Sequence, residues 1–277
     1  MQQADRGIAL RVLQAGAIAV VLAAAPYKSF DLDRFFVPKE LVLGITALVV
    51  TLLVVARVRR LSLARVDELL ALFLILGVVS ALFATNWWLA GRALALSFGG
   101  AACFWCARAL ARAGYSRALV AALAFAGVVG AATALLQAYG VRTDFVSLNR
   151  APGGTFGNRN FMAHLSVITL PALLFAGLRA PTRAAFARWC VGLALVAGAL
   201  ILSRSRAAWL ALLVGLVVLA IAGFIALRNN DGTLKPMRLL AMLLAAGAGG
   251  GAALVIPNML DWRSDSPYLD TAHSIVN

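Results

Sequence analysis

Long apolar stretches alternate with short polar ones along almost the whole chain. An α-helix needs about 20 apolar residues to cross a hydrocarbon core of about 30 Å, and many of the stretches approach that length. They are residues 8–25, 41–56, 67–86, 89–107, 117–140, 160–178, 185–203, 207–226 and 238–256. The pattern predicts an all-α fold, a polytopic bundle of about nine transmembrane helices.

The composition supports the same class. Of 277 residues, 62% are hydrophobic and 13% are charged, and the mean hydropathy is +0.90, far from the values of soluble domains. We expect one membrane domain over residues 1–256. Residues 257–277 are expected to open a polar extracytoplasmic loop that is incomplete at Asn277. Residues 1–25 fit either a first membrane helix or a cleaved signal peptide.

The formal net charge of +14 would by itself suit a nucleic-acid partner. The basic residues are instead scattered through short loops, which argues against that partner and leaves membrane lipids as expected ones. More of them fall on the side of the N-terminus than on the other, including Arg57, Arg59 and Arg60. The positive-inside rule then predicts a cytoplasmic N-terminus and an extracytoplasmic C-terminus.

The stretch NRAPGGTFGNRNF, residues 149–161, interrupts the apolar pattern on the predicted outer side. Asn158 and Asn160 are both suitable N-caps for the next helix, whose positive dipole end then faces outward. Three glycines let the backbone approach a ligand and turn amides toward it: Gly153, Gly154 and Gly157. Arg150 and Arg159 add positive charge. Together these residues predict an anion site, and phosphate suits it best.

A second anion motif, ILSRSRAAW, covers residues 201–209 and turns the chain on the same side. Ser205 can cap the second helix, and Arg206 lies in its first turn, where a cation opposes the helix dipole unless an anion is present. Arg204 precedes the turn and suits a lipid headgroup as well as a ligand. Two helix starts and up to four arginines suit a diphosphate, because guanidinium groups make bidentate contacts with phosphate oxygens.

His164 lies one turn into the helix that follows the first motif. It could act as a base near neutral pH, although a helix histidine that is simply hydrogen-bonded is the more common case. Cys103 and Cys106 form a C-x-x-C inside an apolar helix and are expected to be packing residues. No set of His, Cys and carboxylates has metal-ligand spacing, and nucleotide-binding motifs are lacking. We therefore expect neither a metal nor a cofactor.

The sequence GTFGNRNFMAHL, followed by SRSRAAWLALL, resembles the O-antigen ligase and polymerase superfamily of bacterial envelopes. FFVPKE and the tail LDWRSDSPYLDTAHSIVN are similar to that family's early loop and to the opening of its large periplasmic loop. The resemblance covers nearly all of the chain and implies the bacterial inner membrane, with the site at the periplasmic face. Arg206 matches the arginine of the family's Ser-Arg-(Gly/Ala) motif, whereas Arg159 stands where proline is frequent.

The resemblance implies a glycosyltransferase of lipopolysaccharide biosynthesis that takes a glycan from undecaprenyl diphosphate. The acceptor is lipid A–core for a ligase or another glycan for a polymerase, and the sequence leaves both open. The family is metal-independent and uses arginines to hold the diphosphate. Its histidine base lies in the large periplasmic loop, so we expect the catalytic base beyond Asn277. Two alternatives of other classes are an anionic lipid or glycan transporter and a carrier-lipid binder without catalysis.

Overall fold

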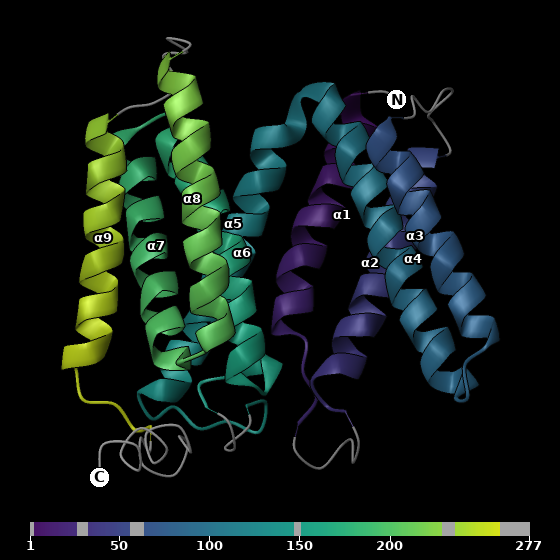
Figure 1. Cartoon of the computed structure of the whole chain (residues 1–277), viewed down its shortest axis with the longest axis horizontal. Helices are drawn as coiled ribbons and strands as arrows, with labels where there is room; N and C mark the ends of the chain where they lie inside the picture. The colour runs from purple at the N-terminus through teal and green to yellow at the C-terminus, as the bar shows by residue number, and fades with distance from the viewer. Residues whose placement is uncertain (1–2, 27–32, 56–63, 147–150, 229–235, 261–277) are drawn as a thin grey trace. The chain divides into compact units, whose positions relative to one another are not determined.

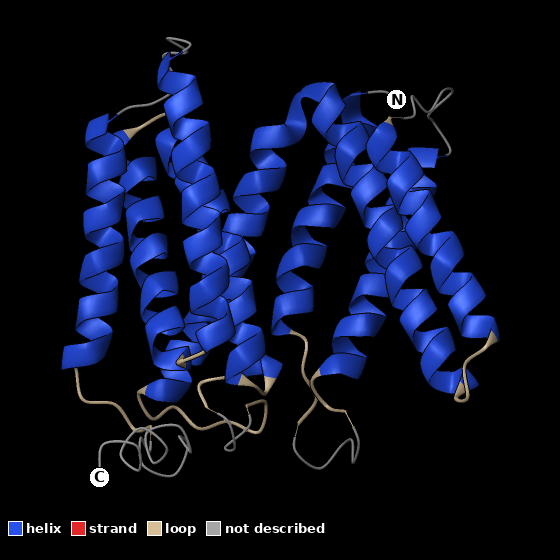
Figure 2. Cartoon of the chain, viewed as in Figure 1, coloured by secondary structure: helices blue, strands red, loops and turns tan. Residues whose placement is uncertain are grey.

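The computed structural model describes residues 3–26, 33–55, 64–146, 151–228 and 236–260 (Figure 1). These residues form α-helices and no β-strand (Figure 2). The described helices are α1 (Gln3–Leu22), α2 (Phe36–Val55), α3 (Arg65–Leu82), α4 (Trp87–Leu110), α5 (Ser116–Ala138), α6 (Arg159–Leu178), α7 (Arg183–Ser203), α8 (Arg206–Arg228) and α9 (Pro236–Val255). The predicted all-α class is confirmed.

Five helical segments are long and apolar enough to cross a membrane: Phe36–Val55, Trp87–Ala138, Arg159–Leu178, Arg183–Ser203 and Pro236–Val255. The second of these has 52 residues, because it joins α4 to α5 through a π-helical turn, Ala111–Tyr115. Gly114 has φ 96° inside this turn, so the helical path breaks there. Segments of this length and composition suit a multi-pass helical membrane protein.

The helices pack into two compact units. Unit 1 contains Met1–Ala23 and Phe36–Leu123, and unit 2 contains Ala24–Phe35 and Ala124–Asn277. Helix α5 therefore begins in unit 1 and continues in unit 2. Each unit has its own buried apolar residues, as expected for helices that hide one face against their neighbours.

In unit 1, α2 packs against α1 and α4, and α4 also packs against α3. Buried side chains of α1, α2 and α4 form its core: Ala9, Val50, Val54, Cys106 and Leu110. Lys39 of α2 is buried, and its Nζ donates to the carbonyl oxygens of Val21 (3.1 Å) and Ala23 (2.6 Å). A cation thus caps the negative C-terminal end of α1.

A second set of polar contacts in unit 1 joins α3 to α4. The carboxylate of Asp67 is buried and accepts hydrogen bonds from Ala64 N (2.7 Å) and Trp105 Nε1 (3.0 Å). It also forms an ion pair with Arg108. Asp67 lies in the first turn of α3 and Arg108 in the last turn of α4, so each charge also suits its own helix dipole.

In unit 2, α7 packs along both α6 and α9, and α6 also contacts α8. Helices α7 and α9 approach closely at Gly249 of α9. A Cβ at this position would collide with the backbone of Ala194 of α7. At the C-terminal end of α6, Arg238 Nη1 donates to the carbonyl oxygens of Leu178 (3.2 Å) and Ala180 (2.8 Å). The packing holds the ends of α6 to α9 in fixed positions within this unit.

Candidate functional site

The first predicted motif forms a tight loop that leads directly into α6. Asn158 is the N-cap residue, with φ −147° and ψ 127°, and its side chain accepts a hydrogen bond from Asn160 N at 2.9 Å. Arg159 is the first residue of the helix. Of the two asparagines that could cap this helix, the structure selects Asn158 and places Asn160, which is exposed, in the first turn.

The three glycines of this loop are required by its own packing. Gly154 and Gly157 have φ values of 52° and 66°, in the left-handed region that favours glycine. A Cβ would collide with Asn158 N at Gly153, with Thr133 at Gly154 and with Phe35 at Gly157. These contacts give the glycines a structural reason that does not need a ligand.

Two of the loop amides already donate within unit 2. Gly154 N donates to Gln137 Oε1 at 2.8 Å, and Gly157 N donates to the carbonyl oxygen of Gly154 at 3.2 Å. Direct contact between the glycine amides and an anion therefore stays a prediction. The stronger donors at this place are the arginine side chains and the start of α6.

The second motif forms the short turn between α7 and α8. Arg204 follows the last residue of α7 with φ 50° and ψ 27°, a conformation that costs a non-glycine residue on the order of 1 kcal/mol. Ser205 is buried, and its carbonyl oxygen accepts a hydrogen bond from Trp209 N at 3.1 Å. Arg206 is the first residue of α8, as the sequence predicts.

Packing brings the starts of α6 and α8 together. Ala163, just over one turn into α6, and Ala208, in the first turn of α8, are both fully buried and share a core cluster with Leu200 of α7. Small side chains at these positions let the two helices approach closely. The positive ends of α6 and α8 therefore lie at the same end of unit 2, beside the C-terminal end of α7 (Figure 1).

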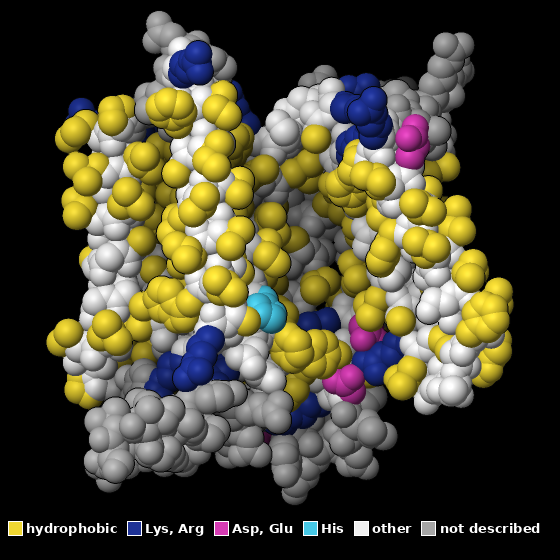
Figure 3. Space-filling model, viewed as in Figure 1, with side chains coloured by type: hydrophobic (Ala, Val, Ile, Leu, Met, Phe, Trp, Pro, Cys, Tyr) yellow, Lys and Arg dark blue, Asp and Glu magenta, His cyan; other side chains and the backbone are white. Residues whose placement is uncertain are grey.

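This end of unit 2 carries more cations than carboxylates among its described residues. The cations are Arg34, Arg142, Arg159, Arg204 and Arg206, and the carboxylates are Asp33 and Asp144. Arg206 is exposed, whereas Arg159 and Arg204 are half-buried. Figure 3 shows lysine and arginine side chains gathered at the start of α8. The excess of positive charge and the two helix starts favour an anion here.

Other predicted residues contribute less. Arg150 and residues 261–277 lie outside the described residues. His164 is exposed on α6. Within the described residues, no group of three or more His, Cys, Asp or Glu side chains is placed to hold a metal ion.

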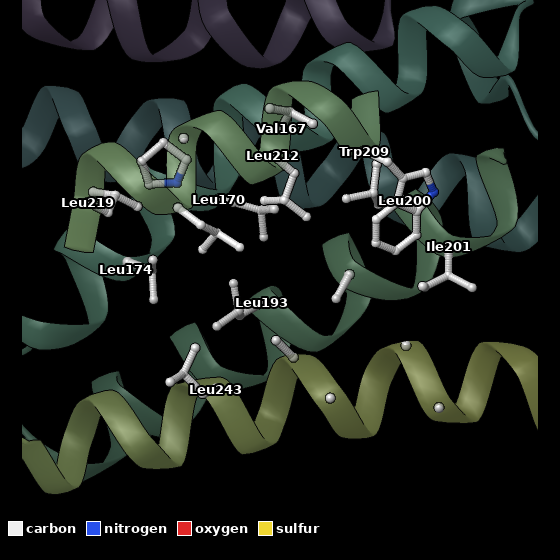
Figure 4. A pocket seen from close by; sticks show the side chains of 18 of the residues that line it. Val167, Leu170, Leu174, Leu193, Leu200, Ile201, Trp209, Leu212, Leu219 and Leu243 are labelled. Atoms are coloured by element: carbon white, nitrogen blue, oxygen red, sulfur yellow. The ribbon is translucent and has the colours of Figure 1, made fainter. Parts of the chain in front are cut away.

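The sequence did not indicate an open apolar cavity of about 610 Å³ that residues of α6, α7, α8 and α9 line (Figure 4). Its lining includes Val167 and Leu170 of α6, Leu193 of α7 and Leu212 of α8. Gly247, Gly250 and Gly251 of α9 also line it. Gly249 and Gly250 lie against Ala194 and Ile201 of α7, whereas a Cβ on Gly247 or Gly251 would meet nothing within 4 Å, so these two leave room in the cavity.

The cavity reaches the anion motif at one end. Ile201 and Trp209 line it, and each lies three residues from an arginine, Arg204 and Arg206 respectively. Figure 4 places Ile201 and Trp209 at one end of the cavity, and Leu174, Leu219 and Leu243 at the other. A molecule with an anionic head and a hydrocarbon tail matches this order of surfaces.

Comparison of the chain with protein-family models, curated proteins and solved structures finds no match. The site itself therefore carries the functional inference.

Proposed function

We propose that this chain is an O-antigen ligase-like glycosyltransferase of the membrane that binds an undecaprenyl-diphosphate-linked glycan. The observation that carries the proposal is the convergence of two arginine-bearing helix starts, those of α6 and α8, beside an apolar cavity. The diphosphate would lie against Arg206, Arg204 and Arg159. The polyprenyl tail would enter the cavity and pack against its apolar lining by van der Waals contact, the main attraction between apolar surfaces inside a bilayer.

The proposal includes nine membrane crossings, one for each helix α1 to α9, in the bacterial inner membrane. The N-terminus would be cytoplasmic, since the loops on that side carry more arginine and lysine. The starts of α6 and α8 would then face the periplasm, where lipid-linked glycans are used. A polymerase would use the same donor site with another glycan as acceptor in place of lipid A–core.

In the proposed reaction, an acceptor hydroxyl oxygen attacks the anomeric carbon of the donor glycan. The bond from that carbon to the diphosphate oxygen breaks, and its electron pair leaves on the diphosphate. The arginines and helix starts stabilise the charge that develops there, and one such donor commonly contributes about 3 kcal/mol. The hydroxyl proton passes to a general base, for which His164, exposed on α6, is the candidate among the described residues.

The test compares Arg206→Ala with Arg228→Ala, two exposed arginines at opposite ends of α8. The purified chain in lipid nanodiscs is titrated with undecaprenyl diphosphate and with undecaprenyl alcohol, and binding is followed by the rise in the thermal midpoint. We expect Arg206→Ala to weaken diphosphate binding at least about tenfold. Arg228→Ala should bind as the unmodified chain does. Equal affinities of the two variants would refute the site.

Binding and catalysis are separated by a second measurement. Membranes that contain the chain receive donor glycan and lipid A–core, and transfer is read from the size distribution of the lipopolysaccharide. Transfer that is lost in Arg206→Ala supports the enzyme. Diphosphate binding without transfer by the complete protein favours a non-catalytic carrier-lipid binder. Movement of the lipid across liposome membranes without any glycan product favours a transporter.

A further inference from the structure

A second groove in unit 2 lies between α7 and the part of α5 that belongs to this unit. It has a volume of about 610 Å³, within the range of about 300–1,000 Å³ that small-molecule sites occupy. Phe125 and Val128 of α5 line one side, and Val191, Gly192 and Leu195 of α7 line the other. The two helices touch at Gly192, where a Cβ would lie 2.8 Å from Val128 Cγ2. The groove opens beside this contact.

One cation interrupts the apolar lining. Arg188 lines the groove beside Trp189 and is exposed. It lies five residues after the start of α7 at Arg183, which is about 8 Å along the helix axis at 1.5 Å per residue. A guanidinium at this depth reaches the headgroup level of a bilayer, while its methylene stem lies along apolar surface.

At the end of unit 2 where α7 begins, the positive charges favour an external anion. Among the described residues of unit 2, the carboxylates are Asp33 and Asp144, and both lie in loops at the end where α7 finishes. Arg238, by contrast, has its own role, because it donates to the carbonyl oxygens at the end of α6. The described residues of unit 2 give Arg188 no carboxylate to pair with at this end.

We propose that this groove binds one anionic phospholipid, with its phosphate at Arg188 and one acyl chain along Val191 and Leu195. The apolar lining suits an acyl chain, and the cation at its edge selects a lipid with net negative charge. Trp189 suits the same depth, because indole rings favour the headgroup region. This site lies at the opposite end of α7 from the diphosphate site, so it does not depend on the proposed transferase function.

The test uses the fluorescence of Trp189 as a local probe. The full chain is reconstituted in phosphatidylcholine vesicles that contain a minor fraction of brominated phosphatidylglycerol or of brominated phosphatidylcholine. Bromine quenches tryptophan on contact, and the signal of Trp189 is the difference between the chain and its Trp189→Phe variant. We expect phosphatidylglycerol to occupy the site with about tenfold preference, which corresponds to about 1.4 kcal/mol.

Two further variants make the result specific. Arg188→Gln should abolish the preference, whereas Arg183→Gln, at the exposed start of the same helix, should retain it. Val191→Trp, read through the amount of phosphatidylglycerol that co-purifies, should fill the groove and expel the lipid while Arg188 is kept. Equal quenching by the two brominated lipids, or an unchanged preference in Arg188→Gln, would overturn the proposal. Displacement of lipid by a second copy of the chain, seen as a dimer by mass, would overturn it as well.

Discussion

Replacement of Asp67 tests whether the buried ion pair holds α3 against α4. Asp67→Ala leaves Arg108 and Trp105 Nε1 without their shared acceptor. Removing one partner of a buried pair costs about 3–5 kcal/mol. The side chain of Arg108 is 17% exposed, against 4% for Asp67, so water reaches part of the stranded guanidinium. We therefore expect a loss near the lower end, about 3 kcal/mol.

A double-mutant cycle separates the pair from general damage to the helix. Arg108→Leu alone strands the carboxylate, while Asp67→Ala with Arg108→Leu leaves neither charge behind. The double variant should lose about 2 kcal/mol less than the two single losses added together. Trp105→Phe should cost about 1 kcal/mol, because it removes one hydrogen bond to the carboxylate.

The assay is the free energy of reversible unfolding in detergent micelles, with Glu68→Ala as the matched control. Glu68 is the neighbouring acid in the same turn of α3 and is exposed, so its loss should change stability by less than about 0.5 kcal/mol. Equal losses for Asp67→Ala and Glu68→Ala would refute the reasoning, as would additive single losses in the double variant.

Three other substitutions, one in unit 1 and two in unit 2, probe the packing in the same unfolding assay. Lys39→Met should cost about 2–3 kcal/mol, since it removes the charged donor to two carbonyl oxygens at the end of α1; a loss below about 0.5 kcal/mol would contradict this cap. Gly249→Ala should cost about 1–3 kcal/mol, because its Cβ would collide with the backbone of Ala194. Gly251→Ala is the control, since a Cβ there meets nothing within 4 Å, and it should be neutral or stabilise the protein by up to about 1 kcal/mol. Equal losses of stability for Gly249→Ala and Gly251→Ala would argue against the close approach of α7 and α9.

The helices themselves follow from local sequence. The apolar stretch predicted over residues 160–178 corresponds to α6, Arg159–Leu178, and that over 185–203 to α7, Arg183–Ser203. Side-chain caps are equally local, because Asn158 bonds to an amide two residues away. The ends differ where polar residues continue a helix. Helix α4 runs to Leu110 rather than to residue 107, since Arg108 keeps its charge paired within the last turn.

The candidate site also combines features that local sequence predicts with features that it does not. That Arg206 begins a helix could be predicted, because turn and helix signals lie within a few residues of it. The packing role of Gly154 and Gly157 could not be predicted, because the side chains that exclude a Cβ there are far away in the chain. Thr133 and Phe35 occupy the space that a Cβ on Gly154 or Gly157 would need.

The sequence by itself determined the all-α class and the approximate ends of helices such as α6 and α7, since hydrophobic length and caps are local properties. Tertiary structure alone decided which polar groups meet: Asp67 lies 41 residues from Arg108, and no periodicity indicates that pair. It also decided that α6 and α8 begin side by side through Ala163 and Ala208, and that four helices leave an apolar cavity next to these starts. Helix packing depends on the shapes of distant surfaces, which apolar runs of similar composition do not specify.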